Sequence, residues 1–278
     1  MIRIIADSTS DLGADLITHH QIEIVPLTVI LKEKQYKDGQ DIQTRQLFDF
    51  VTQYGELPKT SAVSVAEFAR AFQGPDEIIY IGISSRLSAS FHNAELAVRE
   101  LEATNIHLID SLNLSAGIGL LVLKVAELRD AGKSAAEIIQ AVQTAIPTVR
   151  TAFVVDTLEY LYLGGRCSAI TNIAGSVLQI RPVIEVRSDG TLGVKEKVRG
   201  SRARSLQSLV DGYKRSLPMI DFHRVFITHT GCPEDAAWLE AELRKISQPE
   251  EICITTAGAV IASHCGPNTI GILYLLKT

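Results

Sequence analysis

Short runs rich in isoleucine, valine and tyrosine alternate with helical stretches through the first half of the chain. The strand-like runs are IRIIA, IEIVPLTVIL, EIIYIGI, NIHLI and AFVV, and the clearest helical stretches are VSVAEFARAF, SFHNAELAVRELEA and AGIGLLVLKVAELRDAG. Strands that alternate with helices in this way predict a parallel sheet with helices on its faces. We therefore expect residues 1–150 to form a Rossmann-like α/β domain.

Two of the predicted helices carry start signals. Ser64 with Glu67, and Ser134 with Glu137, fit the S-x-x-E capping box, in which each side chain bonds the backbone N–H of the other residue. Gly132, just ahead of the second box, marks the end of the preceding helix.

The second half of the chain changes to hairpin-like segments. RPVIEVRSDGTLGVKEKV is typical of two strands joined across Ser188, Asp189 and Gly190, in which the D-G pair is a hairpin signal. The helix SRARSLQSLVDGYKRSL precedes the strand HRVFITH, and Pro233 opens a further helix, PEDAAWLEAELRKI. EICITT, AVIAS and IGILYLLK are three more strand-like runs. We expect an α+β domain over residues 151–278, packed closely on the first because no flexible linker separates them, with a ligand cleft between the two.

Composition and charge narrow the class of protein. With 46% hydrophobic and 21% charged residues, the 278-residue chain is expected to be soluble and globular. Its formal net charge of −5 disfavours a nucleic-acid binder. Asp7 cuts the first apolar stretch short and Lys124 interrupts the longest, so we predict neither a signal peptide nor a membrane span. A cytoplasmic location follows.

The sequence predicts neither a metal site nor a disulfide framework. The four cysteines are scattered without a C-x-x-C pair, which favours free thiols used as small apolar residues. Asp7 closes the first strand, where it is either a metal ligand or catalytic carboxylate, or the cap of a turn. No second carboxylate lies at motif spacing from it. The cysteines are Cys167, Cys232, Cys253 and Cys265.

Hydroxyl side chains gather where predicted strands give way to helices. Three such junctions are ADSTSD at residues 6–11, KTSAVS at 59–64 and ISSRLSAS at 83–90. Helix N-termini at the ends of parallel strands favour anions, and a hydroxyl donates to an anion without adding a charge. Serine and threonine are also the preferred helix caps, which explains Ser64 and one serine of the third junction. The remaining hydroxyls point to a site for an anionic group.

The second half supplies basic groups and a histidine. Arg166 follows two glycines in YLGGRCS, where it is either a presented guanidinium or an exposed turn residue. KEKVRGSRARS is strongly basic, which is typical of a solvated face, although Arg202 and Arg204 oppose the dipole at a predicted helix start. His264 ends the apolar run AVIAS, which we expect to be a strand that points the imidazole into the cleft. The alternative is a packed, hydrogen-bonded histidine.

The ordered set of these segments resembles the DegV family of bacterial fatty-acid-binding proteins, and the resemblance covers essentially the whole chain. The segments are ADSTSDL, KTSAVSVAEF, ISSRLSASFHNAELA, IDSLNLSAGIGLLVLKVAEL, VVDTLEYLYLGGRCS, LQIRPVIEV, KVRGSRA and GAVIASHCGPNTIG. The resemblance implies a two-domain α/β protein that holds a long-chain fatty acid in an apolar tunnel. It implies that Thr60, Ser88 and His264 bind the carboxylate, with Ser61 and Ser85 as neighbouring donors.

The resemblance also implies a partner. Members of the family serve a fatty acid kinase, which phosphorylates the bound acid to an acyl phosphate for phospholipid synthesis. Arg166 and Arg199 are the residues expected at the kinase-facing mouth. The protein is then a carrier with no catalytic residue and no cofactor, and its only contact with a membrane is transient.

Three segments depart from the family pattern. TSAVS lacks the usual Gln-Pro, LSAS replaces LSGT, and HCGPN replaces HTGPG, which leaves the carboxylate site intact and changes the expected tunnel shape.

Two other functions fit the residues alone. One is a phosphotransfer enzyme that uses His264 or Asp7 as phosphoacceptor, and the other is a regulatory module that binds a small polar anion.

Overall fold

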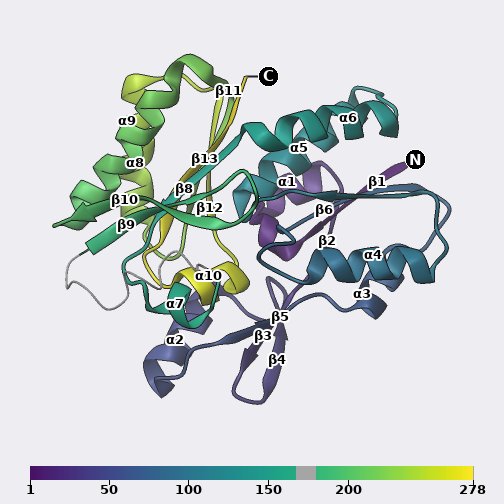
Figure 1. The fold of residues 1–278 in the computed structure, drawn as a ribbon, viewed down its shortest axis with the longest axis horizontal. Coiled ribbons are helices and arrows are strands. Elements are labelled where there is room, and N and C mark those ends of the chain that lie inside the picture. The colour runs from purple at the N-terminus through teal and green to yellow at the C-terminus, as the bar shows by residue number, and fades with distance from the viewer. Residues whose placement is uncertain (167–179, 278) are drawn as a thin grey trace.

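The computed structural model describes residues 1–166 and 180–277, whose strands form three sheets (Figure 1). The first sheet has four strands in the order β2-β1-β6-β7, and every neighbouring pair is parallel. This confirms the parallel sheet predicted for the first half of the chain. Its strands are β1 (Ile2–Asp7), β2 (Ile22–Val25), β6 (Glu77–Gly82) and β7 (Ile106–Asp110).

Helices cover both faces of this parallel sheet. Ile4 and Ile79 belong to one buried cluster, whereas Ile5 and Ile78 belong to another, because successive side chains of a strand point to opposite faces. Strands buried on both faces explain the continuous apolar runs in the sequence. The helices of the first part are α1 (Ala14–His19), α2 (Thr44–Tyr54), α3 (Val65–Ala71), α4 (Ser90–Glu100), α5 (Ala116–Asp130) and α6 (Ala135–Ala145). The capping boxes at Ser64 and Ser134 are both present.

The second sheet has six strands in the order β10-β9-β8-β13-β11-β12 and is antiparallel except for the β11–β12 pair. Its strands are β8 (Val149–Val154), β9 (Ile180–Val186), β10 (Leu192–Arg199), β11 (Ile220–His229), β12 (Glu251–Thr256) and β13 (Ile270–Leu276). One face packs on α8 (Arg202–Ser216) and α9 (Pro233–Ile246). Pro233 opens α9 as predicted, and the hairpin of β9 and β10 turns across Asp189 and Gly190.

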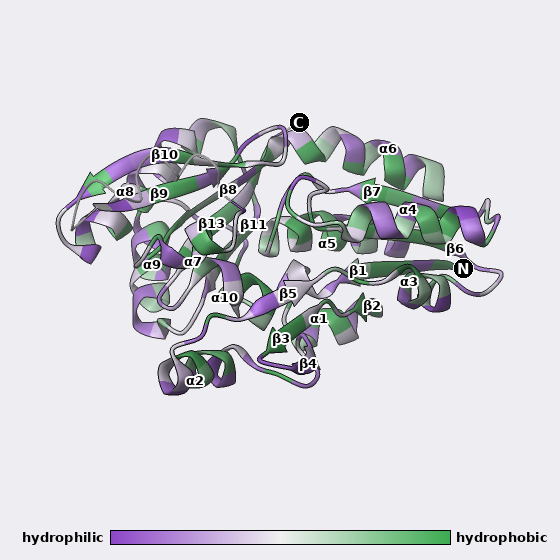
Figure 2. Ribbon diagram, turned by 60° about the horizontal axis from the view of Figure 1, so that its bottom comes forward, coloured by the Kyte–Doolittle hydropathy of each residue, from purple (hydrophilic) through white to green (hydrophobic). Residues whose placement is uncertain are grey.

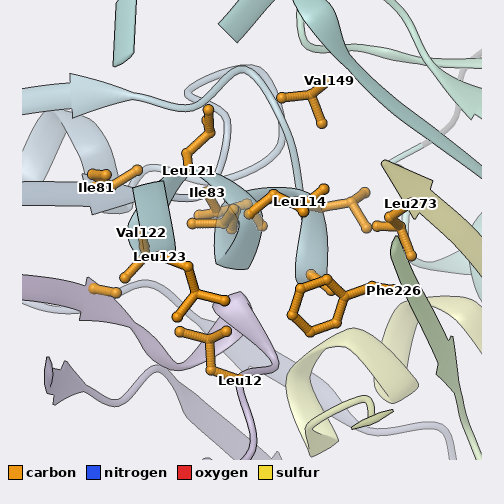
Figure 3. Close-up of a cluster of buried hydrophobic side chains, with 14 of the residues drawn as sticks. Leu12, Ile81, Ile83, Leu114, Leu121, Val122, Leu123, Val149, Phe226 and Leu273 are labelled. Atoms are coloured by element: carbon orange, nitrogen blue, oxygen red, sulfur yellow. The ribbon is translucent and has the colours of Figure 1, made fainter. Parts of the chain in front are cut away.

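Helix α5 lies between the two large sheets. Its buried residues, Leu121 and Val122 among them, belong to one cluster with Ile81 of the first sheet and with Phe226 and Leu273 of the second (Figure 3). A helix that is apolar all round is buried all round. The two halves of the chain therefore share one core instead of meeting across a polar interface.

A small antiparallel sheet, β4-β3-β5, completes the fold. Its strands are β3 (Thr28–Leu31), β4 (Lys34–Lys37) and β5 (Lys59–Ser61), and the hydropathy colours of Figure 2 show β1 and β3 as mostly hydrophobic. Two short helices of the second part, α7 (Glu159–Leu163) and α10 (Ala259–Cys265), pack on each other. Helix α10 also packs on β3, β5 and α2, so it ties the end of the chain to the small sheet.

Three sequence predictions need correction. IEIVPLTVIL is not one strand: Pro26 removes a backbone donor, and β2 and β3 on either side of it belong to different sheets. AFVV lies in β8, an antiparallel strand of the second sheet. AVIAS is helix α10 and not a strand, because a short buried apolar run has the same pattern in both structures.

Candidate functional site

A cavity of about 330 Å³ lies where the small sheet, α7, α10 and the loop after β6 meet. Its walls are mostly apolar, and they come from both halves of the chain. The larger aliphatic side chains of the lining are Leu27, Ile83, Leu87, Leu114, Leu161, Leu192, Val260 and Ile261. Ser61, Ala89 and Arg166 line the cavity and are exposed, so it reaches the surface on that side.

The polar lining centres on Thr60 and His264. Thr60 lies on β5 and His264 in the last turn of α10, and their side chains meet with Oγ1 and Nε2 2.8 Å apart. The histidine therefore reaches the cavity from a helix end and not from the predicted strand end. Ser61 and Ser88 also line the cavity. The structure thus brings together four of the five residues predicted to bind a carboxylate.

The environment of His264 favours a neutral imidazole. Burial, assisted by the positive charge of Arg166, lowers the pKa of His264 to about 4. Nδ1 of His264 is buried and has no hydrogen-bond partner among the residues that the structure describes. A buried nitrogen without a partner is costly for the protein. Nδ1 lies against Gly164, where an added Cβ would come within 2.6 Å of it.

The three serines between β6 and α4 have different roles. Ser84 is buried and its hydroxyl donates to the carbonyl of Gly190 at 2.9 Å, which fastens the β9–β10 hairpin to the first half. Ser85 is exposed, its backbone N–H donates to Asp110, and it does not line the cavity. Ser88 faces the cavity. Its Oγ lies 3.0 Å from Oγ of Ser90.

Ser90 connects two of the hydroxyl junctions. Its hydroxyl accepts from the backbone N–H of Val63, in the segment that follows Thr60 and Ser61. Asn93 of α4 adds a second contact to this segment by donating to the Val63 carbonyl at 2.7 Å. The KTSAVS and ISSRLSAS segments are therefore held against each other, as neighbouring sides of one cavity.

The two arginines expected at the mouth lie in different places. Arg166 lines the cavity, and its guanidinium donates to the carbonyls of Gly164 at 2.6 Å and Leu87 at 3.4 Å. Arg199 is the last residue of β10, is exposed and does not line the cavity. Arg202, three residues further along the chain, pairs with Asp235 at 2.6 Å and donates to the Asn268 carbonyl.

Asp7 is a structural carboxyl. It is fully buried, and it accepts hydrogen bonds from the backbone N–H groups of Thr9 and Ile83 and from the hydroxyl of Tyr80. Burial raises its pKa. Asp7 therefore caps the turn that follows β1, which is the second of the two roles that the sequence left open. Burial leaves Asp7 inaccessible to a phosphoryl donor.

Within residues 1–166 and 180–277 no group of three or more histidine, cysteine or acidic side chains is placed to hold a metal ion. No helix of the described ranges is both long and apolar enough to cross a membrane.

Cys265 lines the cavity, which sequence reasoning missed because the helical phase of α10 was not recognised. Cys167 lies outside the described residues.

Residues 1–277 match the sequence model of the DegV family. The chain belongs to the DegV family. A DegV domain-containing protein of Caldanaerobacter subterraneus subsp. tengcongensis is 34% identical, over 98% of each chain. A solved DegV family protein from Thermus thermophilus, described by its fatty acid binding, has a TM-score of 0.91 at 30% identity over 99% of each chain. DegV from Bacillus subtilis, described as a fatty acid binding protein, has a TM-score of 0.84 at 29% identity, also over 99% of each chain.

The comparison with DegV structures confirms the expected fold class. The N-terminal part is a parallel-sheet α/β unit, and the C-terminal part is built on the mixed six-stranded sheet. In this DegV-family chain the cavity lies where the two parts and the small sheet meet.

Proposed function

We propose that this protein binds a long-chain fatty acid in the cavity and presents its carboxylate to a fatty acid kinase for acyl-phosphate formation. One observation carries the proposal: an apolar cavity whose neutral polar groups include the Thr60–His264 pair and Ser88. The relatives from Thermus thermophilus and Bacillus subtilis, both described as fatty acid binding, support it.

The apolar walls supply the free energy of binding. Each buried methylene contributes about 0.8 kcal/mol, so a sixteen-carbon chain gains on the order of 10 kcal/mol before the costs of association. The cavity of about 330 Å³ lies in the size range of ligand pockets and opens at the surface beside Arg166. We therefore expect the acyl chain inside and the carboxylate at the polar lining.

The polar lining orients the carboxylate without trapping it. With the proton of neutral His264 on Nε2, the imidazole donates to Thr60 Oγ1, and the Thr60 hydroxyl proton is left for the ligand. Ser88 supplies a second hydroxyl. Neutral donors hold an anion without forming a buried ion pair, which suits a carboxylate that must be handed to another protein.

We test binding first by mass spectrometry of an organic extract from protein purified without detergent. The expected result is a near-stoichiometric C14 to C20 fatty acid that is lost from the Thr60→Ala, His264→Ala double variant. Ser85→Ala is the matched control, because it removes an exposed hydroxyl outside the cavity. An empty wild-type extract from protein that also fails to take up added palmitate would overturn the proposal.

The partner half of the proposal needs a separate assay. Protein loaded with palmitate is incubated with a fatty acid kinase and ATP, and acyl phosphate is trapped with hydroxylamine as the hydroxamate. We expect no product without the kinase, since the carrier has no catalytic residue. Arg166→Ala and Arg199→Ala are expected to slow product formation while the bound palmitate remains. Product formed by the carrier alone would contradict a non-catalytic role.

The two alternative functions have less support. Asp7 is buried and cannot accept a phosphoryl group, so His264 is the remaining candidate phosphoacceptor of a phosphotransfer enzyme. Its phosphorylation would be detected as acid-labile phosphate on the isolated protein. A module for a small polar anion has no use for the many aliphatic residues of the cavity wall. Neither has a specific observation in its favour.

A further inference from the structure

Two buried carboxyls hold the start of the helix that carries His264. Asp11 Oδ1 accepts from the backbone N–H of Gly258 at 2.8 Å, and Asp38 Oδ1 accepts from the N–H of Ala259 at 2.7 Å. Gly258 is the N-cap of α10, and His264 lies in the last turn of the same helix. Asp11 and Asp38 come from the opposite end of the chain and from outside the cavity.

Each carboxyl is fixed at both oxygens. Ser115 Oγ donates to Asp11 Oδ2 at 2.5 Å, and Ser8 Oγ donates to Asp38 Oδ2 at 2.8 Å. Asp11 is 6% exposed and Asp38 2% exposed. Burying carboxyls is unfavourable unless their hydrogen bonds are complete, so both side chains have little freedom to move.

The helix starts unusually close to Asp38. A Cβ added to Gly258 would lie 3.0 Å from both Asp38 carboxyl oxygens. The glycine is therefore required for close approach, and its backbone has an ordinary negative φ of −64°. The preceding residue is held as well, because the Thr44 hydroxyl donates to the Ala257 carbonyl.

Asp38 directly follows a strand of the small sheet, and Thr60 lies in that sheet. Asp38 follows β4 and donates its backbone N–H to Leu27, and Thr60 on β5 pairs with Val29 of β3. The small sheet thus contacts α10 twice, through Asp38 at its first turn and through Thr60 at its last. With a rise of about 1.5 Å per residue, these contacts are only about 8 Å apart along the helix.

We propose that Asp11 and Asp38 are positioning residues that set the place of His264 against Thr60 by fixing the first turn of α10. A displacement of the first turn is passed to the last, because a short buried helix moves as a rigid unit. The expected effect on the ligand rests on the proposed fatty-acid function. The effect on His264 itself does not.

The test follows the His264 imidazole by NMR in protein with isotope-labelled histidine, and palmitate affinity in parallel. Asp38→Ala is expected to raise the titration midpoint of His264 from about 4 towards its ordinary value and to weaken palmitate binding about tenfold. Asp38→Asn keeps an acceptor for Ala259 and should restore most of both readouts. Gly258→Ala, which disturbs the same contact by a few tenths of an ångström, should give an intermediate shift even where Asp38→Ala does not fold.

Ser134→Ala is the control, because it removes a helix cap on α6, away from α10. It should lower stability with no change at His264. The proposal is overturned if Asp38→Ala and Gly258→Ala lower the unfolding temperature as Ser134→Ala does while the His264 titration stays as in the wild type. If wild-type protein binds no palmitate, the proposed function fails, and the His264 titration still decides the positioning role.

Discussion

The junctions after β1 and after β6 are alike in sequence and different in structure. Both carry several hydroxyls at the carboxyl end of a parallel strand. After β1, Asp7, Ser8 and Asp11 all form hydrogen bonds within the protein. After β6, Ser88 lines the cavity beside the Thr60–His264 pair. Ser8 and Asp11 border a separate cavity of about 380 Å³, but their side chains already form hydrogen bonds within the protein. We therefore call the junction after β1 closed and the junction after β6 open. Polar groups with complete internal hydrogen bonding stabilise the fold, and those with remaining capacity are the ones available to a ligand.

The largest effect is expected from the closed junction. Asp7→Ala leaves the N–H groups of Thr9 and Ile83 and the Tyr80 hydroxyl without their acceptor. Buried groups left unsatisfied cost about 1–3 kcal/mol each, so we expect a loss of roughly 3 kcal/mol or more in the free energy of unfolding. Urea denaturation measures it.

Asp7→Asn sharpens this prediction. Burial raises the pKa of Asp7, so a neutral amide of the same shape should cost less than alanine. If Asp7→Ala were instead within about 0.5 kcal/mol of the wild type, as for an ordinary surface substitution, the junction after β1 would not be closed and the comparison would fail.

Two serines of the open junction should separate binding from stability. Ser88→Ala removes a cavity hydroxyl, and since hydrogen bonds to charged groups are worth about 1.5–3 kcal/mol, palmitate should bind about tenfold more weakly or worse. Ser90→Ala removes the acceptor of the Val63 N–H and should cost about 1 kcal/mol of stability. Calorimetric titration and urea denaturation of both variants check the pair. Equal binding losses would mean that Ser88 acts only through Ser90.

Sequence reasoning succeeded where a local pattern decides the structure. The capping boxes, the parallel first sheet and the hairpin at Asp189 and Gly190 follow from spacing alone. It failed at AVIAS, because a fully buried run has no polar face to reveal a helical period. The small sheet was missed for a related reason: β3 and β5 meet only through pairing across about thirty residues.

The candidate site, too, has features that the sequence predicts and features that depend on tertiary contacts. The carboxylate-binding roles of Thr60, Ser88 and His264 were predicted from the family resemblance, and the meeting of these residues around one cavity depends on the tertiary structure. Asp11 and Asp38 had no signal, because an aspartate that caps a helix more than two hundred residues away looks like any turn residue.

The dependence of stability on pH also distinguishes the two regions. Burial raises the pKa of Asp11 from 3.8 to about 8, so the folded state binds more protons than the unfolded state between these values. The contribution of Asp11 to the free energy of unfolding is complete below pH 3.8 and is lost as the pH rises through about 8. His264 has the opposite sign, because its pKa is lowered to about 4 and its contribution is lost as the pH falls from 6.5 to 4.

Above pH 6.5 the stability therefore still depends on the titration of Asp11, whereas His264 no longer changes it. We expect the free energy of unfolding to fall by on the order of 1 kcal/mol between pH 6.5 and pH 8. Asp11→Asn should flatten this slope, and urea denaturation across the range measures it. An unchanged slope in Asp11→Asn would assign the loss to another group with a raised pKa. Burial raises the pKa of Asp7 and Asp38, and hydrogen bonds to Glu250 and Glu127 raise the pKa of His223.

The smallest effect is expected from Arg166, which lines the cavity and is exposed. Exposed charges interact weakly because water and salt screen them, so Arg166→Gln should weaken palmitate binding only about two- to threefold, and less at high salt. Arg244→Gln, on the surface of α9, is the control. A loss as large as that of His264→Ala would place the carboxylate at the guanidinium. An exposed charge and not the neutral lining would then hold the ligand, and the distinction between closed and open junctions would no longer locate the site.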